Sequence, residues 1–590
     1  MKRLRLLSLR SAFVSLPNIG LAALVLVVLS RAFSPDLSAA KPNVILIMTD
    51  DQGYGELSSH GHEILKTPNL DRLRDESVRL TDFHVSAKCS PTRGALMTGR
   101  HSRHVGVREA DNGRNIIGRE FSTVADIFSD NDYATGIFGK WHLGGHYPFR
   151  PQDRGFEEVV IHTNGAIGTT GDRWDNDYYD DLFWHNGQLK RYAGYCTDIW
   201  FEEAMTWMEQ SSDNGRPFFC YIPTNAPHGP YIVPDKYAEP FRVAGRKDAK
   251  RLGMISNIDE NIGELMAFLE SAGLEQNTIL IFLTDNGAPR VGNNAGMRGG
   301  KSSGYDGGHR VPFLVRWPDG SITGGKDVDT LTAHIDVLPS LVDLCGLSSG
   351  DTPFDGISLA SLLSGKPDNR FDDRVLVESY SGIVLTEEWR LVNNTELHNI
   401  RLDPAQEKDL SREYPERVQE FQQALAENRA NDFDVTPRII VGSELEPEQE
   451  FTIYHWYDKN GYFNNLKITQ GNLINGVIPI EVQRPGKFEF TLRRWPPQLD
   501  LPIRGKPDND LDGFKLFNAA DPDHRFKAVD IRSARLKVGQ FDGSSPVSEK
   551  MSSVVFSLDL AAGETEIETW FTTAGGKTLG AFYLSVRRIN

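Results

Sequence analysis

The segment from 89 to 100 places a cysteine, a proline and an arginine at a spacing that can build a reactive site. It reads Cys-Ser-Pro-Thr-Arg-Gly-Ala-Leu-Met-Thr-Gly-Arg. Pro91 suits the first turn of a helix, so Cys89 is expected at or just before a helix N-terminus, where the dipole and the free amides favour an anion. Arg93 lies one turn on and can reach back to the same place. The residues alone predict a cysteine nucleophile with an anion pocket; the alternative is a small buried cysteine before a helix.

Two pairs of residues with side-chain oxygen atoms each follow a short apolar run. Asp50 and Asp51 come after Val-Ile-Leu-Ile-Met-Thr, and Asp285 and Asn286 come after Ile-Leu-Ile-Phe-Leu-Thr. Three carboxylates held close together repel one another unless a cation joins them. Ligand sets made only of oxygen favour calcium or magnesium over zinc. Each Asp could instead cap a helix or turn, but the duplicated pattern favours a metal site.

Basic residues follow two further apolar runs. Lys140 and His142 come after the run that contains Ile137 and Phe138, and His228 lies within Ala-Pro-His-Gly-Pro. No Cys or His partners stand at zinc-finger spacing, so these side chains suit proton transfer or anion binding better. The alternatives are structural histidines and a surface lysine.

The candidate site residues are far apart in the sequence, so the helices and strands of the fold must bring them together. Apolar runs alternate with segments of helical spacing, which predicts an α/β sheet covered by helices on both faces, with sites beyond the carboxyl ends of the strands. The predicted strands are Val44–Met48, Ala134–Phe138, Pro217–Pro223 and Thr278–Leu283. The clearest predicted helices are Thr197–Gln210 and Ile255–Ser271.

The pattern of apolar and polar residues changes at the end of the predicted catalytic domain, 41–372, and again at about residue 433. Residues 373–432 predict a small α+β subdomain with short strands and a polar helix, Pro415–Asn428. Residues 433–590 show short alternating runs separated by Gly, Pro and Asn, which predicts an accessory β-sandwich domain.

Residues 1–40 are typical of a secretory signal peptide. A basic start is followed by the apolar stretch Ile19–Leu29 and by small residues at 38–40. The stretch is shorter than the roughly 20 residues of a membrane span, so we expect cleavage, with no stable span in the mature protein. Export machinery is then a partner, and the destination is the periplasm or the exterior.

Charge and cysteine content narrow the class of protein. The 590 residues include 64 Lys and Arg against 81 Asp and Glu, a net charge of −17. Such a chain is a poor nucleic-acid binder, because that binding depends on neutralising phosphates. Four cysteines in this length do not make a disulfide framework.

The motifs together resemble the type I sulfatases of the alkaline phosphatase superfamily. The segment 89–93 is similar to their Cys-x-Pro-x-Arg motif, and Gly139-Lys-Trp-His-Leu-Gly144 is similar to their second motif. Leu-Thr-Asp285-Asn286-Gly, Arg298-Gly-Gly-Lys301 and Gly-Gly-x-Arg310-Val-Pro also match, and the resemblance covers about 41 to 420. One departure is Asp306, where these enzymes usually carry Glu.

The resemblance implies an alkaline-phosphatase-like fold and hydrolysis of a sulfate ester. Cys89 would be converted to Cα-formylglycine by a formylglycine-generating maturation enzyme. The aldehyde hydrates to a diol, of which one hydroxyl attacks sulfur and the other then loses its proton and expels sulfate.

The resemblance also implies a role for each site residue. Ca²⁺, in preference to Mg²⁺, would be held by residue 89 together with Asp50, Asp51, Asp285 and Asn286. Asp285 would also be the base that activates the attacking hydroxyl.

Basic groups would serve the diol and the sulfate. Arg93 and Lys140 would hold the diol, and His142 would take the proton that drives sulfate release. His228 and Lys301 would bind sulfate, with His228 favoured as the acid for the leaving oxygen.

Two other readings remain open, and so does the substrate. A phosphonate or phosphate ester hydrolase is possible, because some relatives use the same modified cysteine. A glycan-binding protein without activity would result if Cys89 stayed unmodified. The substrate is an aryl sulfate or a sulfated carbohydrate, and Tyr305 and His309, which flank the Lys301 turn, are candidates for contacting it.

Overall fold

The computed structural model describes residues 41–174, 176–457, 465–507 and 526–589. The predicted signal peptide, 1–40, lies outside the described residues. From Pro42 onward the chain forms one compact unit. Among the described residues, no helix has the length and apolar character needed to cross a membrane.

A ten-stranded mixed sheet forms the centre of the catalytic region, in the order β11-β2-β10-β9-β1-β8-β4-β5-β6-β7. Its five central strands run parallel; they are β9 (Thr278–Thr284), β1 (Asn43–Thr49), β8 (Phe218–Pro223), β4 (Ala134–Lys140) and β5 (Glu158–His162). The outer strands are β11 (Lys326–Val328), β2 (Val78–Leu80), β10 (Phe313–Arg316), β6 (Leu182–His185) and β7 (Gln188–Arg191). The central strands are continuous apolar runs because both faces of the sheet are covered.

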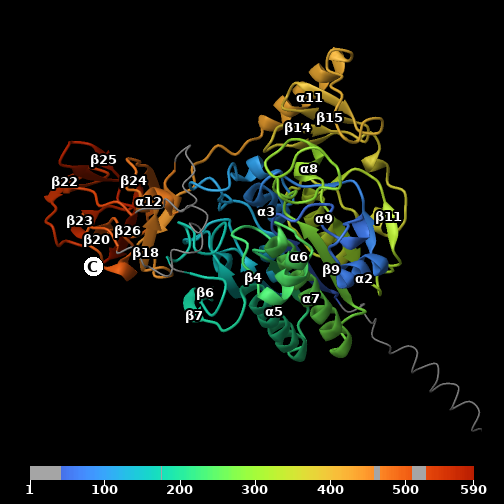
Figure 1. Ribbon diagram of the computed structural model, residues 1–590, viewed down its shortest axis with the longest axis horizontal. Coiled ribbons are helices and arrows are strands. Elements are labelled where there is room, and N and C mark those ends of the chain that lie inside the picture. The colour runs from blue at the N-terminus through green and yellow to red at the C-terminus, as the bar shows by residue number, and fades with distance from the viewer. Residues whose placement is uncertain (1–40, 175, 458–464, 508–525, 590) are drawn as a thin grey trace, which may run out of the picture. The chain divides into compact units, whose positions relative to one another are not determined.

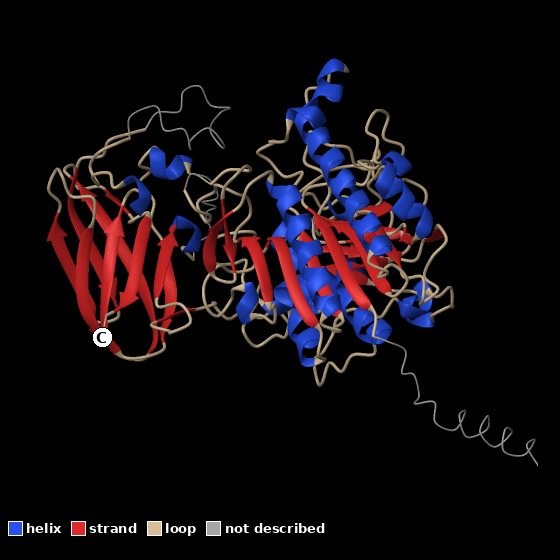
Figure 2. Cartoon of the chain, turned by 90° about the horizontal axis from the view of Figure 1, so that it is seen from below, coloured by secondary structure: helices blue, strands red, loops and turns tan. Residues whose placement is uncertain are grey.

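Helices cover both faces of this sheet, as Figure 2 shows. One apolar cluster joins the sheet to α3 (Cys89–Thr98), α4 (Val124–Asp130) and α9 (Val337–Cys345). The other joins it to α2 (Pro68–Glu76), α5 (Cys196–Asp213), α6 (Asp235–Val243) and α7 (Ala249–Ser271). The predicted α/β fold is therefore confirmed, although α7 starts six residues before the predicted Ile255.

A four-stranded antiparallel sheet follows, with α11 (Pro415–Arg429) beside it (Figure 1). Its strands are β13 (Leu376–Glu378), β14 (Ile383–Leu385), β15 (Trp389–Val392) and β16 (Glu396–Asn399). One face packs on α11, through residues that include Phe421. The other packs on the catalytic region, where Ala95 of α3 lies in the same cluster.

Two β-sheets make up the C-terminal region and share one apolar core. The first contains β17 (Ile439–Val441), β19 (Val477–Val482), β24 (Gly563–Thr573), β21 (Ile531–Val538), β22 (Phe541–Pro546) and β25 (Thr578–Leu579). The second contains β18 (Glu448–Thr452), β26 (Tyr583–Arg588), β20 (Gly486–Arg493) and β23 (Val554–Leu560). Phe149 and Trp174 of the catalytic region belong to the same core. The sandwich therefore packs on the catalytic region, while the exact domain boundaries stay a prediction.

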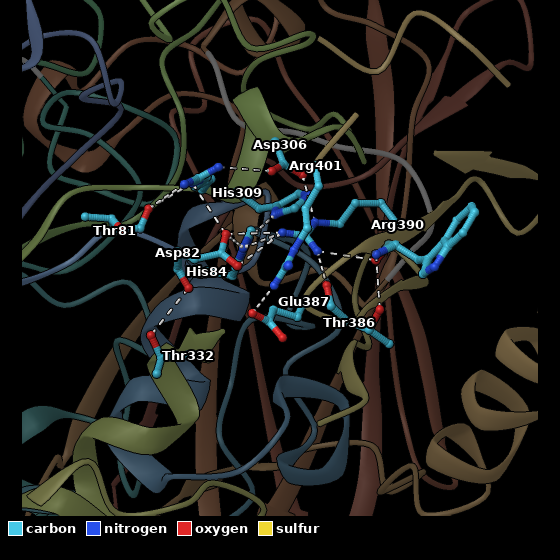
Figure 3. Close-up of polar contacts among 12 residues, drawn as sticks. Thr81, Asp82, His84, Asp306, His309, Thr332, Thr386, Glu387, Arg390 and Arg401 are labelled. Carbon is cyan, nitrogen blue, oxygen red and sulfur yellow. Dashed lines mark hydrogen bonds and ion pairs between the residues drawn. The ribbon is translucent and has the colours of Figure 1, made fainter. Parts of the chain in front are cut away.

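A buried polar cluster joins the small sheet to the catalytic region (Figure 3). Arg390 of β15 lies 3.2 Å from Asp82 and 3.2 Å from Asp306, measured between guanidinium nitrogen and carboxylate oxygen. Asp82 also contacts His84 at 3.0 Å, and His84 contacts His309 at 2.9 Å. Asp306, the departure from the family pattern, therefore serves as a buried partner of Arg390 at the start of α8 (Asp306–His309).

Replacing Arg390 by Met should destabilise the fold by about 3–5 kcal/mol, because two buried carboxylates would lose the nearer of the two guanidinium groups they share and keep only Arg310, at 3.5 and 3.8 Å. The urea midpoint of unfolding measures the effect. Arg401→Met is the matched control, since Arg401 pairs with Glu387 on the surface, where both side chains are more than half exposed. That change should cost less than about 1 kcal/mol. Equal midpoints for the two variants would contradict a structural role for the buried cluster.

Candidate active site

The pair Asp50 and Asp51 meets the pair Asp285 and Asn286 at the carboxyl ends of β1 and β9. These strands are paired in parallel with Thr49 opposite Thr284, so the residues that follow them are neighbours. The Asp51 backbone N–H donates to Asp285 Oδ1 at 3.0 Å, and Asn286 Nδ2 donates to Asp51 Oδ1 at 2.8 Å. Asp51 has a φ of 67°, a left-handed conformation that turns the chain sharply after β1.

Each of the three carboxylates pairs with a different base. Lys140 Nζ, at the end of β4, lies 2.7 Å from Asp50 Oδ2. Lys301 Nζ lies 2.6 Å from Asp51 Oδ1. Arg93 Nη2 of α3 lies 2.8 Å from Asp285 Oδ2. The paired side chains therefore carry no net charge.

The surroundings of Asp285 and Asp51 shift the pKa values of these two carboxyl groups in opposite directions. Burial and the neighbouring Asp50 raise the pKa of Asp285 to about 6, against the effect of Arg93. Burial also acts on Asp51, but there Lys301 and His228 outweigh it and hold the pKa of that carboxyl below its usual value. Asp51 is thus the more firmly ionised of the two.

Cys89 is the first residue of α3 and is only 4% exposed. Burial raises the pKa of its thiol, although Lys140 and Lys301 are near enough to oppose this. The thiol therefore keeps its proton near neutral pH, which is unfavourable for a thiolate nucleophile. All four cysteines of the chain lie within the described residues, and all are buried and free.

His142 is held by its backbone and by one ring nitrogen. Its N–H donates to the Thr163 carbonyl at 3.0 Å, and its carbonyl accepts from Ser90 Oγ at 3.1 Å. Nε2 lies 2.6 Å from the Ala110 carbonyl. Because a carbonyl oxygen only accepts, Nε2 carries the proton, and Nδ1 is a buried acceptor with no hydrogen-bond partner among the described residues. Burial, Lys140 and Arg93 hold the pKa of this ring well below its usual value.

His228 lies on the Asp51 side of the site, with Nε2 3.7 Å from Asp51 Oδ2. Its Nδ1 donates to the Gly229 carbonyl at 2.6 Å. Burial and Lys301 lower its pKa to about 3. A pKa this low makes the ring neutral near pH 7, which weakens the case for His228 as the acid.

The oxygen atoms between β1 and β9 fit a hard cation. Asp50 Oδ1 and Asn286 Oδ1 are buried and have no hydrogen-bond partner among the described residues. Asp50, Asp51 and His228 each offer a ligand atom, and these atoms lie within 4.8 Å of one another. Carboxylate and amide oxygens are the ligands that Ca²⁺ and Mg²⁺ prefer.

Residues 42–347, more than half of the chain, match the family model described as Sulfatase. The chain belongs to the sulfatase family. It is a sulfuric ester hydrolase.

Individual sulfatases are also similar to this chain in sequence. The sulfatase is 30% identical over 370 residues to arylsulfatase A of Homo sapiens, an alignment that covers 57% of this chain and 70% of the relative. It is 30% identical over 375 residues to N-acetylgalactosamine-6-sulfatase of Canis lupus familiaris, covering 58% and 70%.

The solved structure of Ps i-CgsB in complex with k-i-k-neocarrahexaose is also similar. It shares 25% identity with a TM-score of 0.61, over 66% of this chain and 93% of that one.

The sequence patterns did not predict a buried ion pair, Arg251 with Glu56, that contacts the backbone of Asp51. Arg251 of α7 donates from Nη2 to the Asp51 carbonyl and to Glu56 Oε2, both at 2.6 Å. Glu56 in turn accepts from the backbone N–H groups of Gly53 and Asn293 at 2.9 and 3.0 Å. A charged residue among the buried positions of α7 could have indicated this ion pair. The predicted helix began at Ile255, however, and therefore did not include Arg251.

The C-terminal region also reaches this site. Asn115 Nδ2 donates to the His142 carbonyl at 3.1 Å and to the Tyr454 hydroxyl at 3.0 Å. Tyr454 contacts the Ala110 carbonyl at 3.3 Å, the same oxygen that holds His142. A sequence separation of more than 300 residues left no local signal for this contact.

The two predicted substrate contacts of the sulfatase lie apart from the acid–base pairs. The Tyr305 hydroxyl donates to Glu396 Oε2 at 2.7 Å, and the Arg298 guanidinium lies 3.9 Å from its ring centroid. His309 is fully buried, and its ring nitrogens contact His84 and the Gly304 carbonyl. We therefore assign His309 to the buried cluster of Figure 3 instead of to a substrate surface, because both of its nitrogens already have protein partners.

Proposed function

We propose that this sulfatase cleaves the sulfate ester of a carbohydrate, using Cα-formylglycine at position 89 and a bound Ca²⁺. The observation that carries the proposal is the convergence of three acid–base pairs beside the start of α3: Lys140 with Asp50, Lys301 with Asp51, and Arg93 with Asp285. Balanced charges become attractive to a sulfate monoanion once a divalent cation is added.

Asp50, Asp51, Asp285 and Asn286 would hold the cation together with residue 89. When bound, Ca²⁺ would polarise a sulfate oxygen, and the hydrated aldehyde would supply the oxygen nucleophile. Asp50 Oδ1 and Asn286 Oδ1 support this assignment, because both are buried oxygen atoms without a hydrogen-bond partner among the described residues.

The residues around position 89 would hold and deprotonate the nucleophile. Asp285, with its raised pKa, is the proposed base. Arg93 and Lys140 would neutralise charge on the diol, since both are fully buried beside the acids. His142 would take the second proton at Nδ1, because its other nitrogen already donates to Ala110.

Lys301 and His228 would contact the sulfate from the Asp51 side. The Lys301 side chain is 20% exposed and the His228 side chain 16%, the most open of the side chains that form the site. One of these two groups would give a proton to the leaving oxygen.

The carbohydrate substrate is supported by the relatives and by the export segment. Arylsulfatase A, N-acetylgalactosamine-6-sulfatase and a structure in complex with a neocarrahexaose are all similar to this chain. Residues 1–40 predict export to the periplasm or exterior, and the maturation enzyme would act on the Cys-x-Pro-x-Arg motif during that route.

Two measurements test the proposal against its rivals. Matched aryl sulfate and aryl phosphonate esters should give the higher kcat/KM for the sulfate, and a faster phosphonate reaction would favour the phosphonate hydrolase. Mass spectrometry of the peptide around Cys89 should show a loss of about 18 Da, from loss of H₂S and gain of one oxygen atom. An unmodified thiol in protein from the native host would support the inactive glycan-binding alternative.

A further inference from the structure

A cleft of about 470 Å³ lies between the catalytic region and the β-sandwich. Its catalytic wall includes Thr163, Asn164 and Trp184, and its sandwich wall includes Glu450 and Tyr583. The volume is within the usual range for ligand pockets, about 300–1,000 Å³. Neither the acid–base pairs nor Cys89 line it.

The cleft adjoins the element that holds His142. The Thr163 carbonyl in its wall accepts the His142 N–H at 3.0 Å, and Gly145 and His146 of the same wall follow His142 in the chain. His146 is tied to the sandwich by a 3.0 Å contact with Glu446, whose other oxygen accepts from the Tyr147 N–H at 2.8 Å. The two walls are therefore linked by direct polar contacts.

Two side chains of the cleft lining each carry a buried acceptor atom that has no hydrogen-bond partner among the described residues. The atoms are Asn164 Oδ1 and Asp172 Oδ1, on side chains that are 1% and 9% exposed. The remaining polar atoms of both side chains are engaged: Asn164 Nδ2 donates to Thr163 Oγ1, and Asp172 Oδ2 accepts from the Gly168 N–H. A buried acceptor costs free energy until a donor reaches it, so a side-chain rotation that presents either oxygen to the cleft would favour a ligand that carries hydroxyl groups.

An apolar surface stands beside these acceptors. Trp184 of β6 is half-buried, and Leu189 of the edge strand β7 is 37% exposed. Both line the cleft. A cleft lined by an indole and by polar side chains matches a sugar ring, which has apolar C–H faces and an edge of hydroxyls.

The charges of the cleft select against an anion. Its lining contains four carboxylates and two guanidinium groups; these are Asp172, Glu446, Glu448 and Glu450, with Arg150 and Arg173. Arg150 is already paired with Asp153. This excess of acid contrasts with the catalytic centre, where acids and bases balance.

We propose that this cleft binds neutral, unsulfated sugar residues of the glycan chain that the enzyme processes. The inference rests on the proposed carbohydrate substrate. The catalytic centre would take the sulfated residue, and the cleft would take uncharged residues of the same chain. The sandwich thereby forms half of a binding site.

The test is calorimetric titration with three hexasaccharides. Two are neutral, from desulfated carrageenan and from cellulose, and the third, from desulfated chondroitin, carries a carboxylate on alternate residues. At least one neutral hexasaccharide should bind, at least about tenfold more tightly than the chondroitin one, because of the acidic lining. No binding of either neutral hexasaccharide, or preference for the carboxylated one, would overturn the proposal.

Variants locate the binding. Trp184→Ala and Asn164→Leu should each weaken binding of the neutral hexasaccharide by about tenfold or more, through loss of stacking and of the buried acceptor. Trp570→Ala is the matched control, since Trp570 is a half-buried tryptophan of β24 that does not line the cleft, and it should bind like the unaltered protein. Unchanged binding in both cleft variants would overturn the assignment.

Hydrolysis of 4-nitrophenyl sulfate, measured on the same proteins, separates this inference from the proposed function. The cleft variants should keep the aryl sulfate kcat/KM, because the small ester does not extend beyond the catalytic centre. Binding of the neutral hexasaccharide by a protein that hydrolyses no sulfate ester would count against the function alone. Hydrolysis without hexasaccharide binding would count against the cleft alone.

Discussion

Replacing Cys89 by Ala should abolish turnover of sulfate esters, with kcat reduced by about 10⁴-fold or more, because the change removes the nucleophile itself. Cys89 begins α3 and is buried, and Ala is a good helix residue, so the fold should tolerate the change. Lys301 and His228 remain in place, so the variant should still bind the ester. Initial rates on an aryl sulfate and calorimetric binding measure the two effects.

Cys89→Ser sharpens the test. Serine offers one hydroxyl where the hydrated aldehyde offers two, so it should not restore repeated turnover. Cys345→Ala is the matched control, because Cys345 is another buried, free cysteine at the end of α9, and it should keep its activity per folded molecule. Turnover in Cys89→Ala close to that of the unaltered protein would refute the nucleophile assignment.

Asp285→Asn should lower kcat by about 10³-fold or more and weaken Ca²⁺ binding as well. The carboxylate accepts the Asp51 N–H at one oxygen and pairs with Arg93 at the other. An amide of the same shape cannot act as a base, supplies one oxygen instead of two, and leaves Arg93 without its charge partner. Calorimetric titration with Ca²⁺ gives a readout that does not depend on activity.

Asp259→Asn is the matched control for that substitution. Asp259 is a buried carboxylate of α7 that accepts the backbone N–H groups of Asn69 and Leu70 at the start of α2. Its replacement should reduce stability but leave kcat and Ca²⁺ affinity unchanged. The same Ca²⁺ affinity in Asp285→Asn as in the unaltered protein would remove Asp285 from the proposed metal site.

The sequence was sufficient to predict four of the five central parallel strands, all but β5, and the chemical groups at their ends. Both came from local information: continuous apolar runs specify strands covered on both faces, and polar residues directly after such runs must lie at the carboxyl edge of a parallel sheet. The family motifs then supplied the activity. Asp50, Asp51, Asp285 and Asn286 are close together because β1 and β9 are paired in register.

Tertiary packing sets which charges meet and which side chains lie outside the site. Arg251 and Tyr454 contact the groups around Asp51 and His142 across separations of 200 and 344 residues, where no periodicity carries information. His309 follows the Lys301 turn in sequence yet faces a buried cluster, because Arg390 from another sheet draws Asp82 and Asp306 together. Residue spacing specifies local elements, whereas the partners of a buried charge depend on which elements pack together.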